Sequence, residues 1–359
     1  MTAPFRIAIL ALVGSLTACS SLYRYDASEV PSILQGAEAE LAGEVPEDER
    51  DPVDLVKRLR SAREVPGLTS TTREQIQAAL ELAAGRLIRL AEDPDPLVPL
   101  VDADLPRRLS VDAGVRGAEL LYSEGERMRA FEIIKNVDLK FPQHHLRPEA
   151  GELLSRIGQD LAADDRRYAF FFRYKSLGIE VLEYFTLEYP SDPRGAAALQ
   201  SLAGIYEERR RYGLAIHAHE DLLLWFSGDP GVVISEAAIP RLRLAVLGSP
   251  EHDRREMELA RNECEQWLAN YRGHPLTPQV ESVRTDAIQR LADNDLIVAK
   301  FYQTVGGLEG AEYHARRALR EARDGGDEAQ IREAEQLLGE VAGSVDASVT
   351  GEGEGSEGS

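Results

Sequence analysis

The chain has 359 residues and a formal net charge of −21, with 43% hydrophobic and 29% charged residues. This composition can form a sizeable core in one long domain or two. It also suits a repeat array in which each repeat buries its face on its neighbours. Phosphate backbones repel so acidic a chain, which argues against nucleic acid as a partner. The same charge disfavours electrostatic docking on anionic lipid, so membrane attachment requires a hydrophobic anchor.

The N-terminus has the pattern of a signal peptide. Arg6 precedes an apolar run over 7–16, which is about half of what a bilayer span needs. The next segment, Leu16-Thr17-Ala18-Cys19, resembles the lipobox of bacterial lipoproteins. That resemblance implies removal of residues 1–18 and lipidation of Cys19, and two or more acyl chains anchor a protein stably. The alternative is an ordinary secretory signal with a chance cysteine near its cleavage site.

Residues 19–55 are polar and acidic, and we expect a flexible tether there. A helical region with a Pro-rich loop follows over 56–110. Within it, Thr71 and Glu74 have the spacing of a capping box, and the prolines of the 93–109 segment end the helix.

From 111 to 342 the apolar residues recur at helical spacing, in segments of roughly 12–20 residues. The aromatic stretch around Phe171 also fits this period, so a helix is predicted over 168–182. The final segment, 343–359, is rich in Gly, Ser and Glu and is predicted to be a disordered tail. The predicted fold is therefore all-α.

An internal repeat organises the helical region. Several helices close with an aromatic residue followed by a proline, as in Lys140-Phe141-Pro142, Glu188-Tyr189-Pro190 and Tyr271-Arg272-Gly273-His274-Pro275. Small residues also recur 12 positions apart, as Ala118 with Ala130, Ala203 with Ala215, and Ala299 with Ala311. These spacings predict a tetratricopeptide-like array of helix pairs that cross closely at the alanines. The alternative is an all-α bundle with generic small-residue contacts.

The sequence contains no catalytic motif that would support an enzyme, and no cofactor or metal is expected. The two histidine pairs, His144-His145 and His217-Ala218-His219, lack the geometry of a chelating site. Cys264 lies at helical spacing from Ala260 and Trp267, which indicates a core residue.

The segments 290–302 and 306–319 resemble the C-terminal repeat of the BamD (YfiO) family of outer-membrane assembly lipoproteins. They carry Arg290-Leu291-Ala292, then Ala299-Lys300-Phe301-Tyr302, and further on an Ala-x-x-Arg element before an apolar helix. The resemblance covers about 116–340 and is strongest over 260–320. One departure is the turn Val305-Gly306-Gly307-Leu308, where that family has a basic Arg-Gly turn.

This resemblance implies a lipid-anchored scaffold on the periplasmic face of the outer membrane that binds proteins during β-barrel assembly. The implied partners are a barrel insertase with POTRA domains or unfolded outer-membrane proteins. The alternative is another periplasmic repeat lipoprotein, in envelope constriction or a secretion system. In the ordinary tetratricopeptide register the partner-binding residues are Leu296, Ile297 and Lys300, unless the helix over 326–341 buries them.

Overall fold

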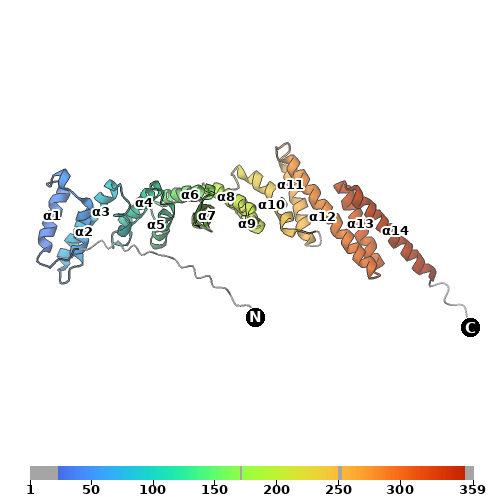
Figure 1. Ribbon diagram of the computed structural model, residues 1–359, viewed down its shortest axis with the longest axis horizontal. Coiled ribbons are helices and arrows are strands. Elements are labelled where there is room, and N and C mark those ends of the chain that lie inside the picture. Colours follow the sequence, from blue (N-terminus) through green and yellow to red (C-terminus); the bar gives the residue numbers. More distant parts are fainter. Residues whose placement is uncertain (1–22, 170–171, 250–252, 352–359) are drawn as a thin grey trace, which may run out of the picture. The chain divides into compact units, whose positions relative to one another are not determined.

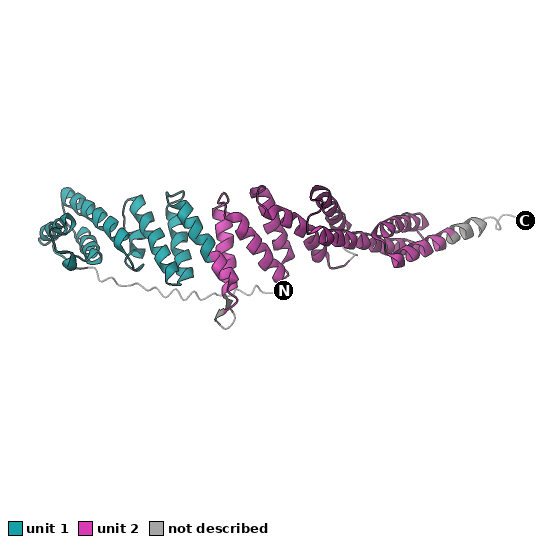
Figure 2. Cartoon of the chain, turned by 90° about the horizontal axis from the view of Figure 1, so that it is seen from above, with its two compact units in different colours: residues 1–157 teal, residues 158–359 magenta. Residues whose placement is uncertain are grey.

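The computed structural model describes residues 23–169, 172–249 and 253–351. The predicted signal peptide and Cys19 lie outside these residues. None of the described helices combines the length and apolar composition that a bilayer span requires. The chain divides into two compact units, residues 1–157 and 158–359 (Figure 2). Each unit is described by itself.

Unit 1 begins with a bundle of three helices, α1 (Val30–Ala42), α2 (Pro52–Arg63) and α3 (Ser70–Leu90). Two caps define where these helices begin: Asp51 accepts backbone N–H bonds at the start of α2, and Thr69 does so for α3. The capping-box pattern predicted Thr71 as the cap of α3. The structure shows that the cap is Thr69 instead.

The bundle shares one hydrophobic core with the 3₁₀ helix η2 (Val98–Asp102) and with α4 (Arg107–Ser123). A short 3₁₀ helix, η1 (Glu47–Glu49), joins α1 to α2. The region before residue 111 thus packs on the first repeat of unit 1.

The prediction of a flexible tether over 19–55 needs correction, because helix α1 lies within that range. Val30, Leu34 and Ala37 of α1 are buried in the core of unit 1. The acidic stretch around residue 47 dominated the composition and masked an apolar helix face just before it.

Helices then follow in pairs along the chain (Figure 1). In unit 1, α4 packs on α5 (Arg127–Lys140). Helix α6 (Arg147–Ala163) runs across the division between the units. In unit 2 the further helices are α7 (Tyr174–Glu188), α8 (Gly195–Glu208), α9 (Tyr212–Trp225), α10 (Gly231–Leu247), α11 (Arg254–Asn270), α12 (Thr277–Thr304), α13 (Leu308–Gly325) and α14 (Glu328–Gly351). The predicted all-α fold of tetratricopeptide-like helix pairs is confirmed.

Two local predictions need correction. A short antiparallel hairpin, β1 (Arg167–Ala169) with β2 (Phe172–Arg173), replaces the first turns of the helix predicted over 168–182, and α7 begins at Tyr174. Aromatic residues favour strands, and this preference prevails over the helical spacing here. At the other end of the chain, α14 continues to Gly351, inside the range predicted to be a disordered tail.

Three helix pairs share the same connecting turn. The residue seven positions after the first alanine has a left-handed backbone in each pair, with φ of +87° at Gly125, +55° at Arg210 and +76° at Gly306. The next residue donates its N–H to the carbonyl five positions earlier: Glu126 to Leu121, Arg211 to Tyr206, and Gly307 to Tyr302. The three copies are therefore in phase in backbone geometry as well as in sequence.

The second helices also end alike. The closing aromatic donates its N–H to the carbonyl four positions earlier at Phe141, Tyr189, Phe226 and Tyr271. Three positions later, Asp192, Asp229 and His274 each accept a bond from the backbone N–H two residues further on, just before α8, α10 and α12 begin. The aromatic–proline element thus ends one helix and starts the next.

Each of the six alanines of the repeat is fully buried. They lie in helices that pack on each other as α4 with α5, α8 with α9, and α12 with α13. A helix pair can approach this closely only where the facing side chains are small.

We predict that Ala203→Leu lowers the free energy of unfolding by about 1–3 kcal/mol, because the added side chain has to displace well-packed neighbours. Ala197→Leu is the matched control, since Ala197 is exposed on the same helix. It should change stability by less than about 0.5 kcal/mol. Urea unfolding of both variants measures this. Equal losses for the two would contradict the proposed helix crossing.

Candidate protein-binding surface

One face of α12 is covered by α14. Gln330 of α14 donates to the Asp293 carboxylate, and Gln303 of α12 donates to Glu340 at 3.1 Å. Between these contacts, Leu296 packs in a cluster with Ala334 and Leu337. This is the face that the ordinary tetratricopeptide register assigned to a partner.

Leu296 is therefore a core residue, with 3% of its surface exposed, and its predicted contact with a partner is wrong. Lys300 forms an ion pair with Glu333 of α14, and both side chains stay about half exposed. The apolar residues of α14 pack mainly against α13, and the same packing brings α14 over this face of α12.

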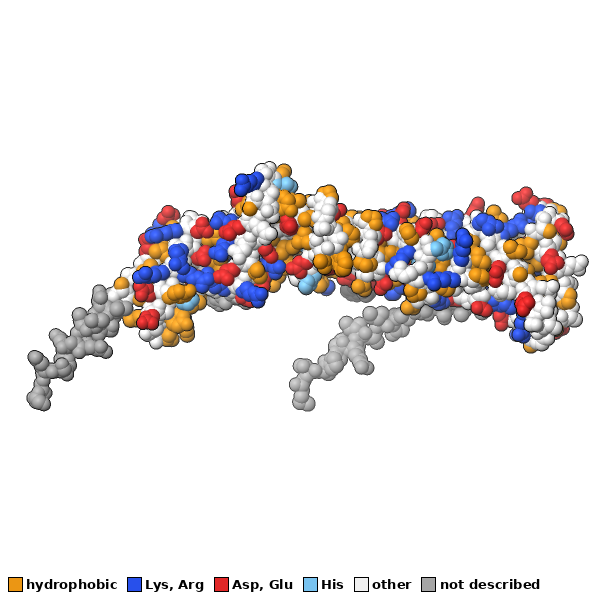
Figure 3. Space-filling view, turned by 180° about the vertical axis from the view of Figure 1, so that it is seen from behind, with side chains coloured by type: hydrophobic (Ala, Val, Ile, Leu, Met, Phe, Trp, Pro, Cys, Tyr) orange, Lys and Arg blue, Asp and Glu red, His pale blue; other side chains and the backbone are white. Residues whose placement is uncertain are grey.

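Ile297 lies outside that cover and is 39% exposed. Phe301 follows four residues later on α12, and Val305 follows four residues after that, as the C-cap of the helix. Each is 61% exposed, so the three residues form one apolar stripe. Tyr302 and Tyr313 are exposed beside it. We call Ile297, Phe301, Tyr302, Val305 and Tyr313 the α12 patch. Hydrophobic side chains gather at this end of the α12–α13 pair, at the lower left of Figure 3.

Two glycines near the α12–α13 turn leave the space that the Tyr302 ring occupies. A Cβ atom at Gly310 would lie 2.8 Å from the Tyr302 ring, and one at Gly307 would lie 3.0 Å from it. The ring therefore lies across the first turn of α13. It stacks on His314, with ring centroids 5.7 Å apart, and Tyr313 meets His314 edge to face.

A buried carboxylate is connected to the α12 patch through His314, which stacks on Tyr302. Asp295 is fully buried in α12 and accepts bonds from His314 Nδ1 at 2.8 Å and from Arg254 Nη1 at 2.7 Å. Arg317 Nε lies 3.5 Å from the same carboxylate. A buried charge is costly unless it is paired and hydrogen-bonded, and Asp295 has both kinds of partner.

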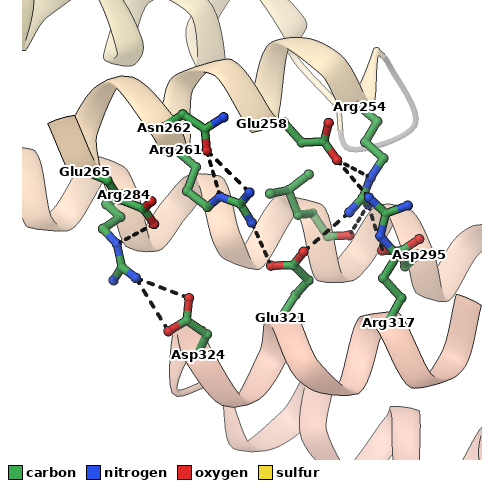
Figure 4. A network of polar contacts seen from close by, with 11 residues as sticks. Arg254, Glu258, Arg261, Asn262, Glu265, Arg284, Asp295, Arg317, Glu321 and Asp324 are labelled. Atoms are coloured by element: carbon green, nitrogen blue, oxygen red, sulfur yellow. Dashed lines mark hydrogen bonds and ion pairs between the residues drawn. The ribbon is translucent and has the colours of Figure 1, made fainter.

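The network extends across three helices (Figure 4). Glu321 of α13 contacts Arg254 and Arg261 of α11, and Arg317 of α13 contacts Glu258 of α11. These ion pairs join α11 directly to α13, and both helices are joined to α12 through Asp295. Because His314 connects this network to Tyr302, the aromatic part of the patch rests on a rigid base.

The described residues contain no group of three His, Cys, Asp or Glu side chains placed to hold a metal ion. Burial raises the pKa of the Cys264 thiol to about 12, so the thiol stays protonated and unreactive near neutral pH. Cys264 packs with Trp267 and Val280, as its helical spacing predicted.

The sequence carried a signal that our site prediction did not use. Phe301 and Val305 continue the four-residue spacing from Ile297. The choice between the two faces of α12 depended on the position of α14, which the spacing within α12 does not encode.

Comparisons with known proteins add the following. No protein-family model matches the chain, and no curated protein matches it. Among solved structures, a tetratricopeptide repeat protein from Parabacteroides merdae is 13% identical, over 87% of this chain and 99% of its own, with a TM-score of 0.22. A circular tandem repeat protein with a novel repeat topology is 14% identical, over 89% of this chain and 75% of its own, with a TM-score of 0.18. Both likenesses are too distant to support an argument about function.

We predict that Asp295→Ala lowers the free energy of unfolding by about 1–3 kcal/mol, because Arg254 and His314 lose a buried acceptor, although Arg254 keeps Glu258 and Glu321 as partners. Asp286→Ala is the control on the same helix. Its ion pair with Arg290 is half exposed, so its loss should cost less than about 1 kcal/mol. Thermal and urea unfolding compare the two variants. A small loss at Asp295 would show that the network does not hold the three helices together.

Proposed function

We propose that the protein is a lipid-anchored scaffold that binds a protein partner through the α12 patch. The observation that carries this proposal is the exposed stripe of Ile297, Phe301 and Val305 at the end of a repeat array. Exposed apolar patches of this kind mark interaction sites on soluble domains. Aromatic residues, which form much of the patch, are enriched in the centres of protein interfaces.

The surroundings of the patch fit an interface. On α13, Glu312 lies next to Tyr313 in sequence and forms an ion pair with Arg316. Energetically important contacts are usually apolar or aromatic anchors inside a polar rim that excludes water. The buried network around Asp295 keeps these anchors in place before binding, which reduces the entropy lost when a partner docks.

The finer proposal is a role in outer-membrane β-barrel assembly, with the protein held at the periplasmic face of the outer membrane by acyl chains on Cys19. It is supported by the lipobox and by the BamD-like residues 290–319. The partner would be a barrel insertase with POTRA domains or an unfolded outer-membrane protein. A role in envelope constriction or secretion would use the same patch with a different partner.

We predict that Phe301→Asp and Ile297→Asp each weaken binding to the purified POTRA domains of the cognate insertase about tenfold or more. A charge introduced into the apolar centre of an interface weakens the binding free energy by about 1.4 kcal/mol or more, which corresponds to at least tenfold in affinity. Surface plasmon resonance measures the affinity, and circular dichroism checks the fold. Leu82→Asp is the control, since Leu82 is an exposed leucine on α3 in unit 1.

Unchanged affinity in the folded α12 variants would remove the patch from this interaction. Absence of any binding by the unmodified protein would favour the constriction or secretion role.

We also predict that Cys19→Ser produces a precursor that keeps residues 1–18 and takes up no palmitate analogue. Lipidation needs the thiol, and lipoprotein processing follows it. Metabolic labelling and mass spectrometry of the N-terminus report both steps. Cys264→Ser is the control, because Cys264 is buried and should not affect labelling. Normal processing and membrane retention of Cys19→Ser would rule out the lipid anchor.

A further inference from the structure

A second surface of unit 2 has a groove with its own chemistry. It has a volume of about 360 Å³ and lies between the ends of α7 and α9, over the first turns of α8. Its apolar lining includes Leu187, Tyr189, Leu199, Trp225 and Phe226, and it contains one carboxylate, Asp221. We call it the α7–α9 groove.

The groove exists because α8 begins with a glycine. A Cβ atom at Gly195 would clash with the Phe226 ring, so the ring rests against bare backbone. On the other side, Tyr189 stacks on Phe185, with ring centroids 5.8 Å apart. Leu187 and Trp225 are left as exposed walls, and Trp225 is 60% exposed.

The same groove recurs one repeat further on, with different residues. There α9 and α11 form the walls over α10, and the volume is about 170 Å³. Counted back from the closing aromatics Phe226 and Tyr271, Asp221 corresponds to Gln266 and Trp225 to Asn270. The architecture therefore produces a groove at both repeats. The second groove is also lined by Trp267, Glu236 and Glu263, but Trp267 is only 2% exposed, so an exposed aromatic wall beside an acid occurs only in the first of these two.

Asp221 gives the α7–α9 groove its polarity. Within the described residues its carboxylate has no hydrogen bond or ion pair. Partial burial and the neighbouring Glu220 raise the pKa of Asp221, and His217 opposes the shift. A cation from outside would offset this unfavourable environment. A tryptophan face is also the best aromatic partner for a cation, and the net charge of −21 attracts basic partners.

We propose that the α7–α9 groove binds a segment of a partner protein in which a bulky apolar side chain stands next to a lysine or arginine. The apolar side chain packs among Leu187, Tyr189 and Phe226. The basic group lies between the Trp225 indole and the Asp221 carboxylate. This site goes beyond the proposed function, because it lies on other helices than the α12 patch. The proposal for the groove therefore does not depend on whether the α12 patch binds a partner.

Trp225 itself reports on occupancy. The chain has two tryptophans, and the other, Trp267, is 2% exposed. Acrylamide should therefore quench mainly Trp225, and a molecule seated in the groove should shield it. The probes are blocked peptides without tryptophan, in which Phe-Arg, Phe-Glu or Gly-Arg is flanked by glycine and serine. They are titrated into the full chain to about 1 mM, the weak-affinity range expected for short peptides.

We expect the Phe-Arg peptide to shield Trp225 and the other two peptides to shield it far less. Asp221→Asn should raise the concentration of Phe-Arg peptide needed for half-maximal shielding of Trp225 about fivefold. A loss of this size is expected when one exposed ion pair is removed. Glu309→Gln, an acid removed from exposed surface on α13, should leave this concentration unchanged. Equal shielding by Phe-Arg and Phe-Glu, no shielding at all, or no effect of Asp221→Asn would overturn the proposal.

Discussion

The structure depends on one constraint: each helix has an apolar face that has to be buried by neighbouring helices of the array. Alanines meet this constraint where the paired helices cross, at Ala203 and Ala215 and at their equivalents. The left-handed turn residue fixes the angle at which the second helix returns, and the closing aromatic ends it. Because these elements recur in phase, each unit can be extended pair by pair without a central core.

An array built in this way leaves a face uncovered at its last pair. Here α14 covers one side of α12 with Leu337 and Ala334, while Phe301 and Val305 remain exposed on another. Besides apolar packing, a buried carboxylate in the middle of α12 holds this helix to its neighbours. Asp295 draws arginines from α11 and α13 onto α12, which fixes the helix that carries the exposed residues. The buried ion pairs and the proposed binding surface thus lie on the same helix.

The repeat was predictable because it is local: the 12-residue alanine spacing and the aromatic–proline ends are visible in sequence and reappear as turns and caps. The failures have physical causes. The apolar face of α1 was hidden by acidic neighbours, and strand preference prevailed over helical period in β1 and β2. At the site, Ile297 was placed correctly on the surface, whereas Leu296 was not. Which side of α12 remains free depends on α14, a contact between segments about 40 residues apart whose partner cannot be inferred from spacing.

The central claim is that α12 contacts a partner through its exposed stripe and not through the side that faces α14. Site-specific photocrosslinking in cells that express the lipidated protein tests it most directly, with the crosslinker placed at Phe301, Val305 or Lys300 in turn. The account predicts one discrete adduct from Phe301 and Val305 and a much weaker one, or none, from Lys300, which lies against α14. Adducts from Lys300 alone, or none from any of the three positions, would contradict it.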